Sequence, residues 1–295
     1  MRDRLLVGLV RTLSRLPLPV LYAMAEALLW VLYDLARYRR DLVRSNLRRT
    51  LPELSECTRR RVARHSYRNA LQTLVETIKA LRIDKSALLR RVTIENPEAV
   101  LAPIRAGVPV VAAAAHQANW EWFQLAVAAQ LDCPAVALYK HLNHPAFDDL
   151  MLGLRARFGT RLFAQDELLG LLRERRRPRL VGMVADLAPR PHDDKHWTRF
   201  FDIDTAFYKG PELLARRLEC PLLFARMRRV GRGRYRIRFE SLADTPADLP
   251  PGALMDRYAA AVEREIRAAP QDWLWLYKRW KYPRGSTDAT RESGD

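Results

Sequence analysis

The residues that could do chemistry begin with His116 and, five positions later, Glu121, within the stretch VPVVAAAAHQANWEWFQLA of residues 108–126. Residues 108–115 carry no charge and no polar alternation, which predicts a strand buried on both faces of an α/β sheet and followed by a helix. His116 then emerges at the carboxyl end of that strand, the edge where open α/β sheets bind ligands. We expect Asn119 to cap the helix and Glu121, in its first turn, to reach back to the imidazole.

An imidazole with one ring nitrogen bonded to a carboxylate is a general base suited to taking a proton from an alcohol, as acyl transfer to a hydroxyl requires. The chain has no G-x-S-x-G sequence and no cysteine beside a base, so direct attack of the acceptor on a thioester is simpler than an acyl-enzyme route. The alternative is that His116 is a hydrogen-bonded core residue and Glu121 an ordinary carboxylate at a helix start.

Polar residues near other strand ends are further candidates. Asp186 follows the apolar run 180–185 and either lines the acceptor site or caps a turn. Lys209 and Gly210 precede a helix predicted to run through Leu218, whose amino end could hold a phosphate or a thioester oxygen. Two histidine groups, near 141–144 and 192–196, lack a matching second half, so no metal site is predicted.

The hydrophobic pattern predicts helices over about 36–50, 56–81 and 84–91, and strands near 108–115, 134–139, 179–185, 221–227 and 234–240. In the helix predicted over residues 56–81 we expect a buried side and a solvated side. The buried side is Leu71, Leu74, Val75 and Ile78, and the solvated side is Arg64, His65 and Arg68.

The amino-terminal segment suggests a membrane edge. Residues 5–33 are mostly apolar, but Arg11, Arg15, two prolines and Glu26 interrupt them, and six arginines follow between residues 37 and 49 against one acid, Asp41. Polybasic stretches beside an apolar helix favour the cytoplasmic leaflet. A spanning helix, an in-plane anchor, a buried core helix and a solvated arginine-rich helix all remain open at this stage.

Composition fits a folded, strongly basic protein. The 295 residues are 48% hydrophobic and carry a formal net charge of +17, which calls for an acidic partner such as anionic lipid headgroups, an acyl carrier protein or nucleic acid. Nucleic acid is not expected, because basic and aromatic residues are not interleaved on one element. Three widely spaced cysteines, Cys57, Cys133 and Cys220, fit a reducing compartment.

Several blocks along nearly the whole chain resemble the bacterial lipid A biosynthesis acyltransferases, the late lauroyl and myristoyl transferases, which share a His-x4-Asp/Glu motif with the wider glycerolipid acyltransferases. These blocks are RSNLRRTLPELSE (44–56), VTIENPE (92–98), HQANWEW (116–122), NHPAFDDLMLGLRARFGTRLF (143–163), VADLAPR (184–190), FYKGPELLAR (207–216) and APQDWLWLYKRWKYPRG (269–285).

The resemblance implies a glycerolipid-acyltransferase-like mixed sheet flanked by helices, with an amino-terminal helical membrane-associating extension. It implies His116 as catalytic base, Glu121 as its partner, and Arg155 or Arg157 as a cation near a phosphate or a developing oxyanion. Because positions i and i+2 of a helix diverge by about 200°, only one of the two arginines is expected to face the histidine. Asn119, Asp186, Lys209 and Gly210 complete the expected substrate-binding set, with no cofactor beyond the acyl donor.

The implied activity is transfer of a fatty acyl chain from an acyl carrier protein, or from coenzyme A, to a hydroxyl of a phosphorylated glycolipid such as a lipid A precursor. The implied location is the cytoplasmic face of the inner membrane, in contact with anionic lipids. The chain departs from the family's usual pattern at Ala118, Leu187 and Tyr277, where glycine, glutamine and histidine are common. These departures leave the acceptor open between a lipid A precursor, another glycolipid and a lysophospholipid.

A non-catalytic basic membrane or nucleic-acid binder is the alternative from another class, against which the retained His116 and Glu121 argue. The expected organisation is a membrane-associating helix (1–35), a basic helical region (36–105), a catalytic α/β core (106–282) and a polar tail (283–295). The aromatic block Trp273, Trp275, Tyr277 and Trp280 either sits at a membrane interface or covers the core.

Overall fold

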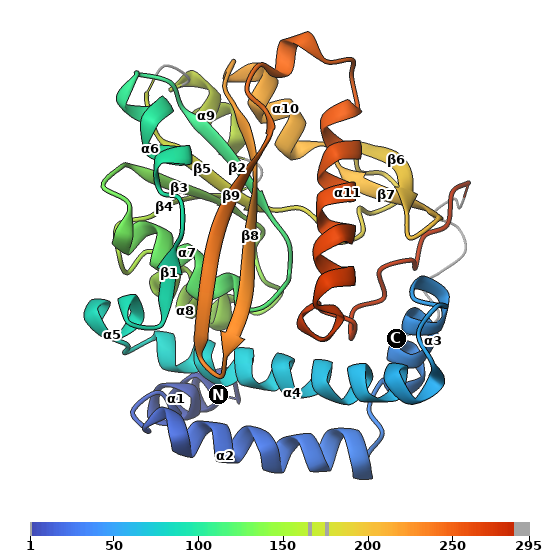
Figure 1. The fold of residues 1–295 in the computed structure, drawn as a ribbon. Coiled ribbons are helices and arrows are strands. Elements are labelled where there is room, and N and C mark those ends of the chain that lie inside the picture. Colours follow the sequence, from blue (N-terminus) through green and yellow to red (C-terminus); the bar gives the residue numbers. More distant parts are fainter. Residues whose placement is uncertain (1, 165–166, 175–176, 286–295) are drawn as a thin grey trace.

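A computed structural model describes residues 2–164, 167–174 and 177–285 of the chain. Its centre is a seven-stranded sheet in the order β1-β9-β8-β2-β5-β3-β4 (Figure 1). The strands are β1 (Val92–Ile94), β2 (Val110–Ala114), β3 (Ala135–Tyr139), β4 (Arg161–Ala164), β5 (Leu180–Val184), β8 (Leu222–Gly231) and β9 (Arg234–Ala243). All neighbours are parallel except β8 and β9, so the sheet is mixed, and the predicted α/β class is confirmed.

The five predicted strands correspond to β2, β3, β5, β8 and β9, and four short strands were not predicted. β1 and β4 are the three- and four-residue edge strands of the sheet, too short to show a periodic pattern. The other two, β6 (Lys195–Phe200) and β7 (Ile203–Tyr208), form a separate antiparallel hairpin whose first strand is largely polar.

Helices cover both faces of the sheet. On one face Phe123 of α7 (Trp120–Gln130) packs against Phe239, and on the other Tyr258 of α11 (Ala253–Ala268) packs against Phe224. The remaining helices of this part are α5 (Lys85–Leu89), α6 (Glu98–Arg105), α8 (Pro145–Arg155), α9 (Leu168–Arg173), α10 (Gly210–Arg217) and the short η3 (Pro246–Asp248) and η4 (Pro270–Asp272). The core is therefore a layer of apolar strand residues between two helical layers.

The amino-terminal helices form a further layer along one end of the sheet (Figure 1). They are α1 (Arg2–Leu13), α2 (Leu18–Leu29), its π-helical continuation η1 (Trp30–Leu35), α3 (Arg40–Thr50) and α4 (Glu56–Ala80). The long α4 begins where Ser55 caps it by accepting a hydrogen bond from the amide of Thr58, at 3.2 Å. It lies between α2 and the sheet, as the blue and cyan ribbons show.

The predicted helices at 36–50, 56–81 and 84–91 agree with α3, α4 and α5, but the expected sides of α4 need correction. Leu71 and Val75 are buried as predicted, whereas Leu74 is exposed. Arg64 and Arg68 do not face solvent freely, because they form ion pairs with Asp34 of η1 and Glu26 of α2. A single sequence shows an amphipathic pattern but not a second helix that covers the polar side.

At the carboxyl end, Trp273 and Trp275 are buried, so these two rings cover the core and are not at a membrane interface. Of the predicted polar tail, residues 286–295 lie outside the part of the chain that the structure describes. The proposed division of the chain into four regions remains a prediction.

Candidate active site

His116 lies just beyond the carboxyl end of β2, where the sequence pattern predicted it. β2 is buried along its whole length because it pairs with β5 on one side and β8 on the other. The imidazole keeps a small exposed surface and lines a cavity at this edge of the sheet. The buried strand therefore ends where the imidazole of His116 is accessible to a substrate.

Asp186 holds the imidazole in place. It follows β5, the parallel neighbour of β2, and its Oδ1 lies 2.7 Å from His116 Nδ1. The carboxylate also accepts the backbone N–H of His116, at 3.0 and 3.1 Å to its two oxygens, and the indole N–H of Trp273 at 2.8 Å. Every hydrogen-bonding direction of this fully buried carboxylate is thus occupied by the histidine or by the tryptophan.

Burial by itself would raise the pKa of Asp186, but the charge of the imidazole and the hydrogen bonds from His116 and Trp273 outweigh it and hold this pKa below its usual range. An ionised Asp186 fixes the proton of the ring on Nδ1. Nε2 of His116 makes no hydrogen bond to any residue that the structure describes, so it is the nitrogen available to a substrate proton.

The expected contact between Glu121 and His116 is wrong. Glu121 instead forms a bidentate ion pair with Arg155, the last residue of α8, with Nε–Oε2 at 3.0 Å and Nη2–Oε1 at 2.6 Å. Two parallel charge-assisted hydrogen bonds satisfy this buried carboxylate better than one imidazole could, and Nδ1 of the ring is already occupied by Asp186. Burial alone would lower the pKa of Arg155, yet the hydrogen bond and charge of Glu121 raise it, so the guanidinium stays charged.

Of the two candidate arginines, only Arg155 lines the cavity, as the helical spacing predicted for one of them. Arg157 points away and donates to the carbonyl oxygens of Ala80 and Ile83 at the carboxyl end of α4. It therefore serves as a cap for α4, and its proposed contact with a phosphate or oxyanion is wrong.

Asn119 caps α7 as predicted, since its Oδ1 accepts the backbone N–H of Trp122 at 2.9 Å. Its Nδ2 donates to the buried Glu76 at 2.7 Å, and the side chain is fully buried without lining the cavity. Direct substrate binding by Asn119 is therefore corrected to a structural role. Asp186 is corrected in the same way, because it lies behind the imidazole and not on the cavity wall.

The cavity beside His116 has a volume of about 750 Å³, within the range of small-molecule sites. Small side chains on three neighbouring strands leave it open beneath α7: Ala112 and Ala114 on β2, Ala135 and Ala137 on β3, and Gly182 on β5. Its apolar floor could hold a hydrocarbon chain, each buried methylene of which contributes about 0.8 kcal/mol.

The rim of the cavity is polar and mostly basic. Lys209 and Gly210, both predicted for substrate binding, line it at the start of α10, and Lys209 Nζ lies 2.7 Å from Asp194 Oδ1. Further cations on the lining are Lys140, Arg190 and Lys281. The site thus joins an apolar interior to a rim suited to anionic groups.

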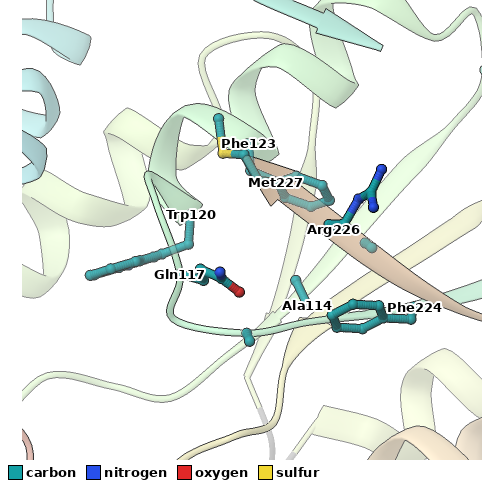
Figure 2. Close-up of a pocket in the computed structure, with 9 residues that line it drawn as sticks. Ala114, Gln117, Trp120, Phe123, Phe224, Arg226 and Met227 are labelled. Atoms are coloured by element: carbon teal, nitrogen blue, oxygen red, sulfur yellow. The ribbon is translucent and has the colours of Figure 1, made fainter. Parts of the chain in front are cut away.

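A second, much smaller pocket of about 10 Å³ lies between Ala114, Gln117, Trp120 and strand β8 (Figure 2). Phe123, Phe224 and Met227 also line it. It has room for about one water molecule and is too small for a substrate.

The loop that carries His116 is held from outside the sheet. Ala118 has a left-handed backbone with φ of +56°, its N–H donates to the carbonyl oxygen of Asp272, and its own carbonyl oxygen accepts Thr73 Oγ1 at 2.9 Å. Sequence reasoning missed Trp273, Thr73 and Glu76 as supports of this loop. The one available signal was the glycine that the family commonly has at position 118.

A histidine oriented by a buried carboxylate, at the carboxyl edge of an α/β sheet and beside an apolar cavity with a basic rim, is an arrangement suited to general-base transfer of a group to a hydroxyl. Residues 2–282 match the family model described as bacterial lipid A biosynthesis acyltransferase. The chain belongs to this family and is an acyltransferase, as the sequence predicted.

The chain is also similar to the lipid A biosynthesis lauroyltransferase of Escherichia coli strain K12. The two are 23% identical over 284 residues, which cover 93% of this chain and 90% of the relative. The lipid A biosynthesis acyltransferases are membrane-associated, and residues Leu18–Leu35 form a helix apolar and long enough to be a candidate membrane segment.

Proposed function

We propose that this protein transfers a fatty acyl chain from the thioester of an acyl carrier protein to a hydroxyl of a phosphorylated glycolipid, such as a lipid A precursor, with His116 as general base. The observation that carries the proposal is the His116–Asp186 pair, which leaves Nε2 of His116 without a hydrogen bond to any described residue, on a ring that lines the cavity of about 750 Å³.

In the proposed reaction, Nε2 of His116 takes the proton of the acceptor hydroxyl while the oxygen of that hydroxyl attacks the thioester carbonyl carbon. The carbon–oxygen bond forms, the carbon–sulfur bond then breaks, and the leaving thiolate takes the proton back from the imidazolium. Asp186 stabilises the imidazolium between these steps without itself becoming protonated.

Arg155 is the proposed donor to the developing oxyanion. Glu121 holds Nε and Nη2 of the guanidinium, while Nη1 has no hydrogen bond to a residue within the described ranges and can donate to a substrate oxygen. Glu121 is thus proposed as a positioning residue for Arg155. This replaces its expected role as partner of the base.

The substrates follow from the shape and charge of the site. The small residues Ala112, Ala135, Ala137 and Gly182 provide the apolar floor for the acyl chain, and the basic rim suits the phosphates of the acceptor. The net charge of +17 suits an acidic carrier protein as donor. The proposed location is the cytoplasmic face of the inner membrane, where such donors occur.

The test is acyl transfer by the purified full-length protein with a labelled acyl chain on carrier protein or on coenzyme A. Three acceptors are compared: a phosphorylated lipid A precursor, the same glycolipid without phosphates, and a lysophospholipid. We expect the fastest transfer from carrier protein to the phosphorylated glycolipid, and a rate at least about 10²-fold lower in His116→Ala.

Undiminished transfer by a folded His116→Ala variant would refute the mechanism. A preference for lysophospholipid or for the dephosphorylated glycolipid would refute the acceptor, and a preference for coenzyme A would refute the donor.

A further inference from the structure

The outward face of the helix formed by α2 and η1 is apolar, although it is exposed. Residues 18–33 contain a single charged side chain, Glu26, and a helix on a water-facing surface normally carries polar residues on its outer side. The exposed large apolar side chains of this helix are Val20, Met24, Leu28, Trp30, Val31 and Leu35, with Trp30 at 59% and Leu35 at 65% exposure. An apolar patch of this kind marks an interaction surface.

The neighbouring helix α1 extends the same character. Leu5, Leu6 and Leu9 are exposed there, at 69%, 46% and 53%. We call the exposed apolar side chains of α1, α2 and η1 together the anchor face.

The opposite face of the α2–η1 helix is fastened to α4 along its whole length. Leu21, Ala25, Leu29 and Tyr33 are buried there. Polar links run from one end to the other: Lys79 Nζ to the carbonyl oxygens of residues 14 and 16, Tyr22 Oη to Glu76 at 2.8 Å, Arg68 to Glu26 at 2.9 Å, and Arg64 to Asp34 at 3.2 Å.

These links decide between the two ways in which the helix could meet a membrane. Residues 18–35 span about 27 Å as a helix, close to the hydrocarbon thickness of about 30 Å, so a transmembrane path is possible by length. Crossing the bilayer would require the helix to leave α4, which would carry Glu26 and Asp34 into lipid without their arginines and remove the Tyr22 hydrogen bond from the buried Glu76. Lying flat requires none of these losses.

Charges at both ends of the anchor face identify the occupant. Arg11, in the last turn of α1, and Arg15, between α1 and α2, are exposed just before the α2–η1 part of this face, and Arg37, Arg39, Arg48 and Arg49 are exposed beyond the end of η1. An apolar helical face bordered by arginines is the pattern of helices that lie in the headgroup region of anionic membranes. We propose that the anchor face lies in the plane of an anionic bilayer surface and that residues 18–35 do not cross the membrane.

This placement brings the catalytic edge of the sheet close to the lipid. α4 separates the anchor face from the histidine loop, since it binds α2 through Glu76 and Tyr22 on one side and donates from Thr73 to the Ala118 carbonyl on the other. Glu76 also accepts from Asn119, the cap of α7, so one buried carboxylate joins the anchor helix to the catalytic loop.

One helix diameter is about 10 Å, so a membrane lipid would need to rise only about that far to approach the loop. This consequence rests on the lipid acceptor of the proposed function, whereas the anchor itself does not.

The first test is the side of the membrane on which residue 11 lies. The exposed native Cys57, at the start of α4, reports the side of the catalytic part, and Arg11→Cys in a Cys57→Ser background reports the side of α1. A membrane-impermeant maleimide is added to right-side-out and to inverted membrane vesicles containing the full chain. We expect residue 11 and Cys57 to be labelled from the same side, and labelling of residue 11 only from the opposite side would overturn the proposal.

The second test is binding of the purified protein to vesicles of phosphatidylglycerol and phosphatidylethanolamine. Met24→Glu combined with Leu28→Glu changes two exposed anchor-face positions and should lower the partition coefficient at least tenfold. Ala102→Glu combined with Ala106→Glu is the matched control, because it adds the same two charges at exposed positions in and just after α6, at the opposite end of the sheet (Figure 1). Unchanged binding of the double variant would overturn the proposal, and neither test uses acyl transfer, so failure here leaves the proposed function standing.

Discussion

Two buried carboxylates, Asp186 and Glu121, lie near His116 and bind different partners. Asp186, 70 residues further along the chain, holds Nδ1 and the backbone N–H of His116, whereas Glu121, five residues away, holds the guanidinium of Arg155. The comparison shows that closeness in sequence does not decide which carboxylate orients the base. The parallel pairing of β2 with β5 decides which carboxylate orients the base, because it places the carboxyl ends of both strands side by side.

The difference extends to the surroundings of the two groups. Asp186 is surrounded by donors from His116 and Trp273 and is shut away from the cavity, so it can act on a substrate only through the ring. Glu121 and Arg155 both line the cavity, so their pair can meet the substrate directly.

Among the substitutions that test the different roles of Asp186 and Glu121, replacing Asp186 should have the largest effect on catalysis. Asp186→Asn removes the charge that stabilises the imidazolium, and we expect kcat to fall roughly 10²- to 10³-fold. In Glu121→Gln we expect kcat to fall only about tenfold, since this change loosens Arg155 but leaves the base intact. Initial-rate kinetics with an acyl thioester and a phosphorylated glycolipid check this, and a larger loss in Glu121→Gln than in Asp186→Asn would reverse the two roles.

The two arginines of the LRARFG segment provide the next contrast. Arg155→Lys cannot form the bidentate pair with Glu121, so we expect a loss in kcat of about tenfold with little change in stability. Arg157→Lys should instead lower the free energy of unfolding by about 1 kcal/mol, because a lysine cannot donate in the same fork to the carbonyls of Ala80 and Ile83, and should retain wild-type kcat.

Steady-state kinetics and urea unfolding of both variants separate the two cases. The assignment fails if Arg157→Lys is the variant that loses catalysis.

Acid should reveal the charge of Asp186. Because its folded pKa lies below its unfolded value of about 4, the ionised carboxylate contributes stability above that pH, and this contribution is lost as pH falls through the folded pKa. Asp186→Asn lacks the titrating group, so its free energy of unfolding should fall less steeply below pH about 4 than that of the wild type. Urea unfolding at a series of pH values checks this, and parallel curves for the two proteins would argue that Asp186 is not ionised in the fold.

The smallest predicted effect concerns the strained backbone before the α7 cap. Ala118 at φ of +56° adopts a conformation that glycine tolerates better, so Ala118→Gly should raise the free energy of unfolding by about 1 kcal/mol. Thermal unfolding measures this change, and a destabilised variant would mean that the methyl group packs more favourably than its backbone strain costs.

The sequence predicted the parts of the site that depend on local pattern. An uninterrupted apolar run located β2 and placed His116 at its end, and the polar residue before the helix located the cap at Asn119. The family blocks gave the enzyme class, which the match over residues 2–282 confirms.

What the sequence did not predict depends on long-range packing. Asp186 was noted at a strand end, but nothing in the chain shows that β5 lies beside β2 or that the Trp273 indole completes its hydrogen bonds. The polar side of α4 looked solvated because its cover, α2, is recognisable only once the two helices are seen packed together.

The measurement that tests the account most directly is the hydrogen bonding of the His116 ring, observed by NMR of protein labelled with ¹⁵N in its six histidines, with His116→Ala to assign the signals. The account predicts a proton on Nδ1 and a bare Nε2 in the wild type. It predicts the same pattern in Glu121→Gln and its loss in Asp186→Asn. Retention of the Nδ1 proton in Asp186→Asn together with its loss in Glu121→Gln would contradict the account.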